Sequence, residues 1–276
     1  MSKDKLNGSF GARGFTLVEM SVVLVVIGVI LGAISIGKDV QRNAEYARIK
    51  QKFIDQWALS YNVYVQRTGY PPGDNQQQPR WMVNGANHTS GLAAGVISGG
   101  NMVGAAAALN SICHGAASAT LADGQRSAQD GGAGAYDLRE LMSKAGVRMP
   151  PGRAEGSEDR YVYLDTNGNP QEIQVCFQWN EPATDAGAGN VMVITGLTPD
   201  LARALDQMID GKADAWEGVF RQGGITTGGA ANVAGVEWSA NNTHTTNQGS
   251  AGAQNLGANL DESQVVTLTA IYKMNQ

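Results

Sequence analysis

A long run of apolar residues near the N-terminus constrains this chain more than any other feature. Residues 15–36 contain a single ionisable side chain, that of Glu19. A helix of this length is long enough to cross a bilayer. Basic residues precede the run, and because such residues stay on the cytoplasmic side, we expect the rest of the chain to be exported. A secretory signal would have a shorter apolar core followed by a small-residue cleavage site, which residues 38–42 (KDVQR) do not provide.

Glu19 also distinguishes the segment from a simple membrane anchor. An ionised carboxylate inside a membrane is costly unless it is paired, so an acidic residue there indicates a function and a partner of opposite charge. A plain anchor remains an alternative, but it does not explain why a glutamate is present.

The residues around Glu19 form a motif. Residues 14–19 (GFTLVE) place a glycine, a phenylalanine and, four residues later, a glutamate at the start of the apolar run and behind a short basic leader. This arrangement resembles the processing motif of type IV prepilins and type II secretion pseudopilins. The resemblance implies that a membrane prepilin peptidase cuts between Gly14 and Phe15, that the new amine of Phe15 is N-methylated, and that Glu19 stays with the mature subunit.

A physical reason for these residue types can be given separately from the resemblance. Gly14 has no side chain to obstruct a protease, and a cut after it leaves a cationic amine at the end of an apolar helix. In a staggered bundle of such helices, Glu19 of one copy can meet the Phe15 amine of its neighbour. Two groups that are costly alone then neutralise each other.

The helix is predicted to continue beyond the membrane. No proline occurs before Pro71, and residues 38–66 keep a helical period. We therefore divide the chain into a leader (1–14), a membrane-spanning and assembly half of the helix (15–36), an amphipathic half (37–66) and a globular head (67–276). The amphipathic half carries one apolar stripe that is expected to pack in the core of the head: Tyr46, Ile49, Phe53, Trp57, Tyr61 and Tyr64.

The head is predicted to contain an antiparallel sheet. Residues 160–164 and 172–179 flank a DTNGN turn and are typical of a hairpin. A third strand at 191–195, a helix at 199–209 and a last strand at 264–274 follow. The fold class is therefore α+β, a long N-terminal helix packed on an antiparallel sheet with long Gly/Asn/Thr-rich loops at 84–135 and 223–259. Residues 137–141, 197–221 and 265–272 are similar to segments of large pilin-like proteins, and at 137–141 the similarity implies a short helix.

The two cysteines, Cys113 and Cys176, both follow the apolar run and are therefore expected in an oxidising compartment. A single disulfide between them is the favoured interpretation, with two unpaired buried thiols as the alternative. A zinc site is disfavoured because neither cysteine belongs to a C-x-x-C pair and no histidine has a zinc-ligand spacing.

Two groups of oxygen-bearing side chains are candidate ion sites. Asp165, Asn167 and Asn169 are spaced as in calcium loops, and major pseudopilins bind calcium in a loop of their head. However, the glutamate that completes an EF-hand loop is missing, and a tight hairpin turn explains the same residues. We therefore predict no cofactor and keep calcium as the less favoured alternative. A second group is expected to form a solvated acidic turn, with an ion site again less favoured: Asp210, Asp214 and Glu217.

Catalysis and nucleic-acid binding are both disfavoured. The three histidines, His88, His114 and His244, lie in the Gly-rich stretches, where a general base would be poorly held, and no nucleophile motif accompanies them. The net charge is −5, and removing a leader of charge +2 leaves −7. A nucleic-acid binder would instead need a basic surface.

Together these observations predict a structural subunit of a type IV pilus, minor or tip-associated because its head is large. The alternatives are a major pilin with an elaborated head, a pseudopilin of a type II secretion system, and an adhesive or DNA-uptake subunit. The expected partners are other pilin subunits, the prepilin peptidase and the assembly machinery. The precursor is expected in the inner membrane with its head in the periplasm, and the assembled subunit in an extracellular pilus or a periplasmic pseudopilus.

Overall fold

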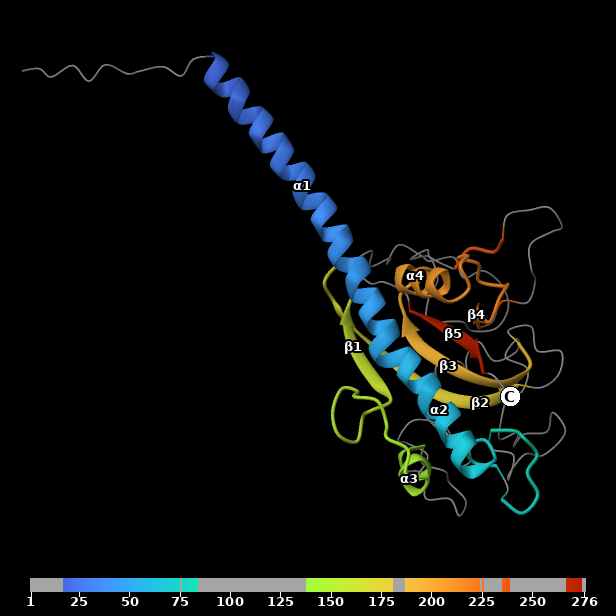
Figure 1. The fold of residues 1–276 in the computed structure, drawn as a ribbon. Coiled ribbons are helices and arrows are strands. Elements are labelled where there is room, and N and C mark those ends of the chain that lie inside the picture. The colour runs from blue at the N-terminus through green and yellow to red at the C-terminus, as the bar shows by residue number, and fades with distance from the viewer. Residues whose placement is uncertain are drawn as a thin grey trace, which may run out of the picture. The chain divides into compact units, whose positions relative to one another are not determined.

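The computed structural model describes residues 17–74, 76–83, 138–180, 187–223, 225, 235–238 and 267–274. The chain divides into two compact units, one up to Glu45 and one beginning at Tyr46. Each unit is described by itself. Figure 1 gives the element labels used below.

One continuous helical stretch extends from Leu17, the first described residue, to Thr68, two residues past the predicted end at 66; residues 15 and 16 of the predicted helix lie outside the described residues. It consists of α1 (Leu17–Ile49), a π-helical turn η1 (Lys50–Ile54) and α2 (Asp55–Thr68). At 1.5 Å per residue it is about 78 Å long. The helix ends because Gly69 adopts a left-handed conformation (φ 81°), from which its N–H donates to the Val65 carbonyl.

The π-helical turn places two neighbouring apolar side chains in the core. In an α-helix, adjacent residues point about 100° apart, so a single narrow stripe cannot hold both Phe53 and Ile54. The wider turn includes one extra residue, and Ile49, Phe53 and Ile54 are all fully buried. An ion pair between Lys50 and Asp55, at 2.9 Å, lies along the same turn.

The head unit contains a five-stranded sheet in the order β1-β2-β3-β5-β4, in which all paired neighbours are antiparallel. The strands are β1 (Arg160–Leu164), β2 (Pro170–Asn180), β3 (Gly189–Leu197), β4 (Phe220–Gln222) and β5 (Leu268–Lys273). The predicted hairpin and third strand are confirmed. β5 lies within the predicted 264–274, of which residues 264–266 are outside the described residues, and β4 was not predicted.

Two short helices complete the described head. α4 (Pro199–Ile209) has the predicted bounds, because Thr198 caps its start by accepting a hydrogen bond from the Leu201 N–H and Pro199 occupies the first turn. α3 (Leu138–Lys144) occurs where the similarity to large pilin-like proteins implied a helix at 137–141. The predicted Gly-rich stretches lie outside the described residues, apart from residues 223, 225 and 235–238.

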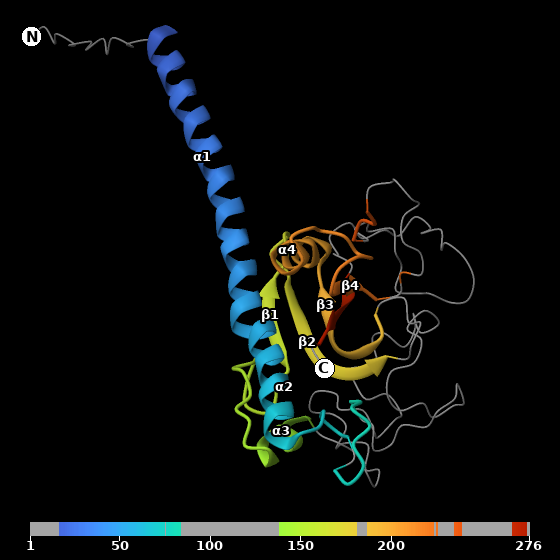
Figure 2. The same ribbon diagram turned by 45° about the vertical axis from the view of Figure 1, so that its right-hand side comes forward.

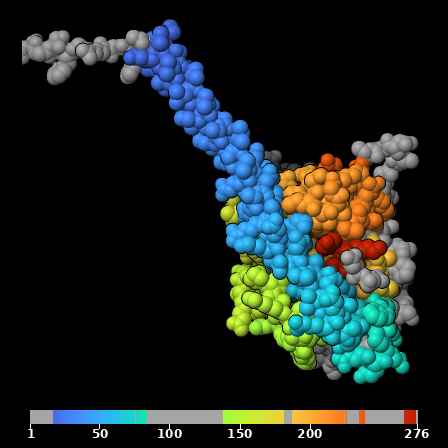
Figure 3. All heavy atoms as spheres, viewed as in Figure 1, coloured from blue at the N-terminus to red at the C-terminus, as the bar shows by residue number. Residues whose placement is uncertain are grey.

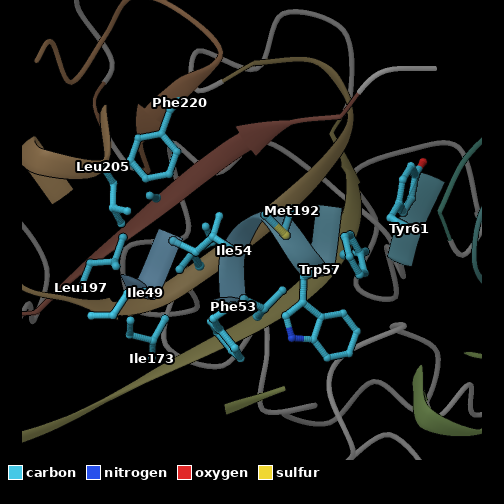
Figure 4. Packing of buried hydrophobic residues seen from close by; sticks show 14 of the residues in the cluster. Ile49, Phe53, Ile54, Trp57, Tyr61, Ile173, Met192, Leu197, Leu205 and Phe220 are labelled. Atoms are coloured by element: carbon cyan, nitrogen blue, oxygen red, sulfur yellow. The ribbon is translucent and has the colours of Figure 1, made fainter. Parts of the chain in front are cut away.

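Aromatic side chains of the helix pack on the sheet. All six residues of the predicted stripe are at most 3% exposed, so the stripe is confirmed as core. The ring centroid of Phe177 on β2 lies 6.2 Å from Trp57 and 5.1 Å from Tyr61. Both ribbon views place α2 along the β1–β2 side of the sheet (Figures 1 and 2), and Figure 4 shows Phe53, Ile54 and Trp57 gathered with Met192 of β3. The α+β arrangement is therefore confirmed.

Candidate assembly segment

The first unit has an apolar surface on every side of its helix. Residues 22–27 form six consecutive positions, each a large apolar side chain that is 46–69% exposed. Because successive residues turn by about 100°, six of them face all directions around the axis. A helix that is apolar all round is stable only in lipid or among other apolar helices. By length and composition, this is the one helix of the described part of the chain that can cross a membrane.

This segment has few polar groups, and they are of two kinds: hydroxyls that are hydrogen-bonded within the helix, and one ionisable carboxyl group. The hydroxyls of Ser21 and Ser35 donate to carbonyls of the preceding turn, at 2.8 Å from Val18 and 3.1 Å from Leu31. These donors are thus satisfied within the helix, as a bilayer requires. Glu19 is different because it is ionisable and lies on the exposed surface of the first turn of α1.

The position of Glu19 in the first turn suits a negative charge. The N-terminal end of a helix carries a partial positive charge from its unsatisfied N–H groups, which stabilises a nearby carboxylate by about 0.3–1 kcal/mol. This contribution is smaller than the cost of burying an isolated carboxylate in an apolar environment. A positively charged partner therefore stabilises an ionised Glu19 further where α1 is surrounded by lipid or by other helices.

Three of the predicted functional residues lie outside the described residues. They are Gly14 and Phe15, which flank the expected cleavage point, and Cys113. Cys176 lies on β2 and is 1% exposed. Its pairing with Cys113 stays a prediction, as do the cleavage and the methylation.

The calcium candidates form a hairpin turn. One carboxylate oxygen of Asp165 accepts hydrogen bonds from the N–H groups of Asn167 and Asn169, both at 2.8 Å, and the other accepts from the side chain of Gln171 at 3.1 Å. Gly168 takes the left-handed conformation that this turn needs (φ 85°). Both oxygens of Asp165 are therefore used by the hairpin itself, which supports the structural interpretation of these residues.

The prediction of a solvated acidic turn after α4 is wrong for one of its three residues, Asp214. Asp214 is 1% exposed, and one of its oxygens accepts from the N–H groups of Trp216 and Glu217. The N–H of Asp214 donates to Asp206, which is fully buried. Sequence reasoning missed Asp206 because it lies on the apolar side of α4. Its spacing of four residues from Asp210 and eight from Asp214 was the available signal.

Comparison with known protein families shows a similarity at the N-terminus of the chain. Residues 10–35 match the family model described as the prokaryotic N-terminal methylation motif. Neither the comparison with curated proteins nor that with solved structures gave a match. The matched range contains the expected cleavage point, Glu19 and most of the apolar part of α1. The N-terminus of this chain therefore carries the methylation motif of the type IV pilin and pseudopilin family, as the sequence had indicated.

Proposed function

We propose that this chain is a structural subunit of a type IV pilus, cut between Gly14 and Phe15, N-methylated on Phe15 and polymerised through its N-terminal helix. One observation carries the proposal: α1 is apolar on all sides of residues 22–27, and its first turn bears a single carboxylate, that of Glu19. The match of residues 10–35 to the methylation motif supports the same function.

The exposed apolar surface of α1 requires two successive environments. From Leu17 to Val40, fifteen large apolar side chains are exposed on the described helix. Fully burying each such side chain is favourable by about 1.5–3 kcal/mol, so the segment is not stable in water. Lipid satisfies this requirement for the precursor in the inner membrane, and a bundle of identical helices satisfies it in the filament.

Glu19 determines the offset between neighbouring helices along their axes. The Phe15 amine of a processed chain lies four residues before Glu19, which is about 6 Å along an α-helix. Two helices offset by about that distance bring the carboxylate of one beside the amine of the other. Burying either charge without its partner is unfavourable. The pair therefore specifies the offset and orientation of neighbouring subunits and also contributes to their attraction.

The head unit is proposed to face the periplasm and then the filament surface. Membership of this family favours a structural rather than an enzymatic role. In this interpretation Cys113 and Cys176 form a disulfide after export, and the partners are other pilin subunits, the prepilin peptidase and the assembly machinery.

The test compares three variants of one residue. Glu19→Ala and Glu19→Gln remove the charge, and Glu19→Asp keeps it on a shorter side chain. Leaving the partner charge buried without a counter-charge costs about 3–5 kcal/mol, which is roughly two to four powers of ten in the constant for adding a subunit. We expect Glu19→Ala and Glu19→Gln to abolish filaments and Glu19→Asp to retain some. Wild-type filament yield from Glu19→Gln would refute the proposed role.

Two measurements serve as controls. A Gly14→Leu variant should keep its leader, as the intact mass of the purified protein will show, and should remain in the membrane without forming filaments. Quantitative mass spectrometry of sheared filaments separates the alternatives. One chain per helical repeat indicates a major pilin and trace amounts a minor one. Absence from intact filaments would favour a secretion pseudopilus.

A further inference from the structure

A buried aspartate joins α4 to a segment that is distant in sequence. Asp206, on α4, is fully buried, and its Oδ2 accepts hydrogen bonds from the Trp238 indole N–H at 2.8 Å and from the Asp214 N–H at 2.7 Å. We call Asp206, Asp210, Asp214 and Trp238 the carboxylate clasp. α4 and the turn after it form the orange surface in Figure 3.

The other two aspartates hold the turn that follows α4. Oδ2 of Asp210 accepts from the N–H groups of Val219 and Phe220, at 3.0 and 2.9 Å. Gly218 permits this approach, because a Cβ added there would lie 2.1 Å from that oxygen. A Cβ on Gly235 would likewise lie 1.5 Å from an Asp214 oxygen. The two glycines thus let the backbone close around the carboxylates.

The clasp fastens residues 235–238 to the head. The Ala215 N–H donates to the Val236 carbonyl at 2.8 Å, and Arg203 of α4 forms an ion pair with Glu237 at 3.2 Å. The indole of Trp238 is fully buried, with its ring centroid 5.4 Å from that of Phe220. The hydrogen bond from Trp238 to Asp206 lies beneath these contacts.

The surroundings of the Asp206 carboxyl group favour its protonated form. Its Oδ1 is buried and has no hydrogen-bond partner among the described residues, which is unfavourable for an ionised carboxylate. Burial, and to a smaller extent the neighbouring Asp210 carboxylate, raise the pKa of Asp206 to about 7 against the lowering effect of the hydrogen bonds from Trp238 and Asp214. A proton on Oδ1 turns this unpaired acceptor into a donor toward Asp210.

The charged groups around Asp206 favour its neutral form. Asp210, which caps the C-terminal end of α4, and Asp214 in the following turn both carry carboxylates. Lys212 pairs with Asp214 and Glu217 rather than with Asp206. On β5, burial raises the pKa of Tyr272, with further contributions from Asp55 and Asp210, so this phenol stays neutral. No ion pair joins Asp206 to a basic side chain within the described part of the head.

We propose that protonation of Asp206 controls whether the carboxylate clasp is closed or open. In the closed state the neutral carboxyl group of Asp206, shared with Asp210, holds the Gly235–Trp238 segment on α4. Loss of the proton releases that segment. In the open state Asp206 is solvated and has its ordinary pKa, about 3.9. Between about pH 4 and pH 7 the closed state therefore binds one more proton than the open state. Opening then becomes roughly tenfold easier for each pH unit in this range and levels off above it, a total of about 10²-fold from pH 5 to pH 8.

Hydrogen exchange of the full chain in detergent micelles tests this proposal. The Asp214 amide donates to Asp206 and the Ala215 amide to Val236 of the segment that the clasp holds, so both report on the clasp. Amides in the β2–β3 pairing provide an internal reference. After correction for the intrinsic effect of pH on exchange, we expect the clasp amides of the wild type to lose about 10²-fold protection between pH 5 and pH 8. The reference amides should change little.

Two variants make the test specific. Asp206→Asn mimics the neutral carboxyl group, so its clasp protection should be high and independent of pH. Trp238→Phe removes a hydrogen bond that favours the ionised form, so its transition should move to higher pH. A flat wild-type profile, or a profile of Asp206→Asn that still changes with pH, would overturn the proposal. Restoration of wild-type protection at pH 8 by calcium chloride alone would also overturn it, because a cation would then replace the proton.

Discussion

Replacement of Gly196 by alanine tests how closely β2 and β3 approach each other. Gly196 lies at the irregular point of β3, where the pairing with β5 shifts register between Ile194 and Leu197. Its φ of 81° is left-handed, and a Cβ built there would lie 1.9 Å from the Glu172 carbonyl oxygen of β2. The obstacle is backbone in the middle of the sheet, so it cannot move aside as a flexible side chain would.

The expected loss has two parts. Holding alanine in the left-handed conformation costs about 1–2 kcal/mol. Relieving the contact requires the Glu172 carbonyl and the new Cβ to separate by about 1 Å or more, and forcing extra atoms into a packed region typically costs about 1–3 kcal/mol. We therefore expect Gly196→Ala to lower the free energy of unfolding by roughly 2–5 kcal/mol.

Gly168→Ala is the matched control. Gly168 has nearly the same backbone conformation (φ 85°), but no atom lies within 4 Å of a Cβ built there. It should lose only the conformational part, about 1–2 kcal/mol. Urea denaturation of the full chain in detergent, followed by tryptophan fluorescence, measures both losses. Equal losses in the two variants would show that the close approach to Glu172 contributes nothing, and would refute the reasoning.

Three further predictions concern the head. Burial raises the pKa of Asp165, but hydrogen bonds from Asn169, Gln171 and Asn167 outweigh this effect and lower it, so its ionised form stabilises the hairpin. That contribution exists above about pH 4 and is lost as the pH falls, so Asp165→Asn should cost about 1 kcal/mol in urea denaturation at pH 7 and nothing near pH 2. Tyr163→Phe removes a hydroxyl that donates to the Gly196 carbonyl and accepts from the Thr198 N–H; the loss should be about 1–3 kcal/mol. Because burial raises the pKa of Tyr163 to about 12, thermal melts between pH 5 and pH 9 should show the same loss throughout. Finally, Cys113 and Cys176 should resist alkylation until reduced, and reduction should lower stability by about 4 kcal/mol; alkylation of the oxidised protein would exclude the disulfide.

Features with local signals could be predicted from the sequence. The helix follows from unbroken periodicity and ends where a glycine and then Pro71 occur. The hairpin follows from two alternating segments around an Asn-Gly pair, and α4 from a threonine cap, a proline in the first turn and an apolar face. In each case the residues that decide the structure lie within a few positions of one another, so no knowledge of distant contacts is needed.

The features that were missed depend on contacts between distant residues. The π-helical turn is needed only because the sheet offers room for both Phe53 and Ile54, which their spacing alone does not indicate. β4 has three residues, too few for a periodic pattern, and is defined by its pairing with β5. Burial raises the pKa of Asp206, and its carboxylate accepts a hydrogen bond from Trp238, thirty-two residues later in the chain. A carboxylate in a helix pattern otherwise indicates a solvated position.

The helix changes character near Tyr46, and this change predicts that assembly and head stability respond to different mutations. Up to Val40 its large apolar side chains are exposed, whereas from Tyr46 on all of them except Leu59 are buried or packed against the core of the head. Glu19 lies twenty-seven residues before Tyr46, where this core begins, so Glu19→Ala should abolish filaments without changing the melting temperature of the head, because distant sites act independently. Gly196→Ala should lower the melting temperature and reduce filaments only as far as it reduces the amount of folded protein. If Glu19→Ala instead destabilised the head as much as Gly196→Ala does, its loss of filaments would reflect misfolding, and the charge pairing proposed for Glu19 would lose its support.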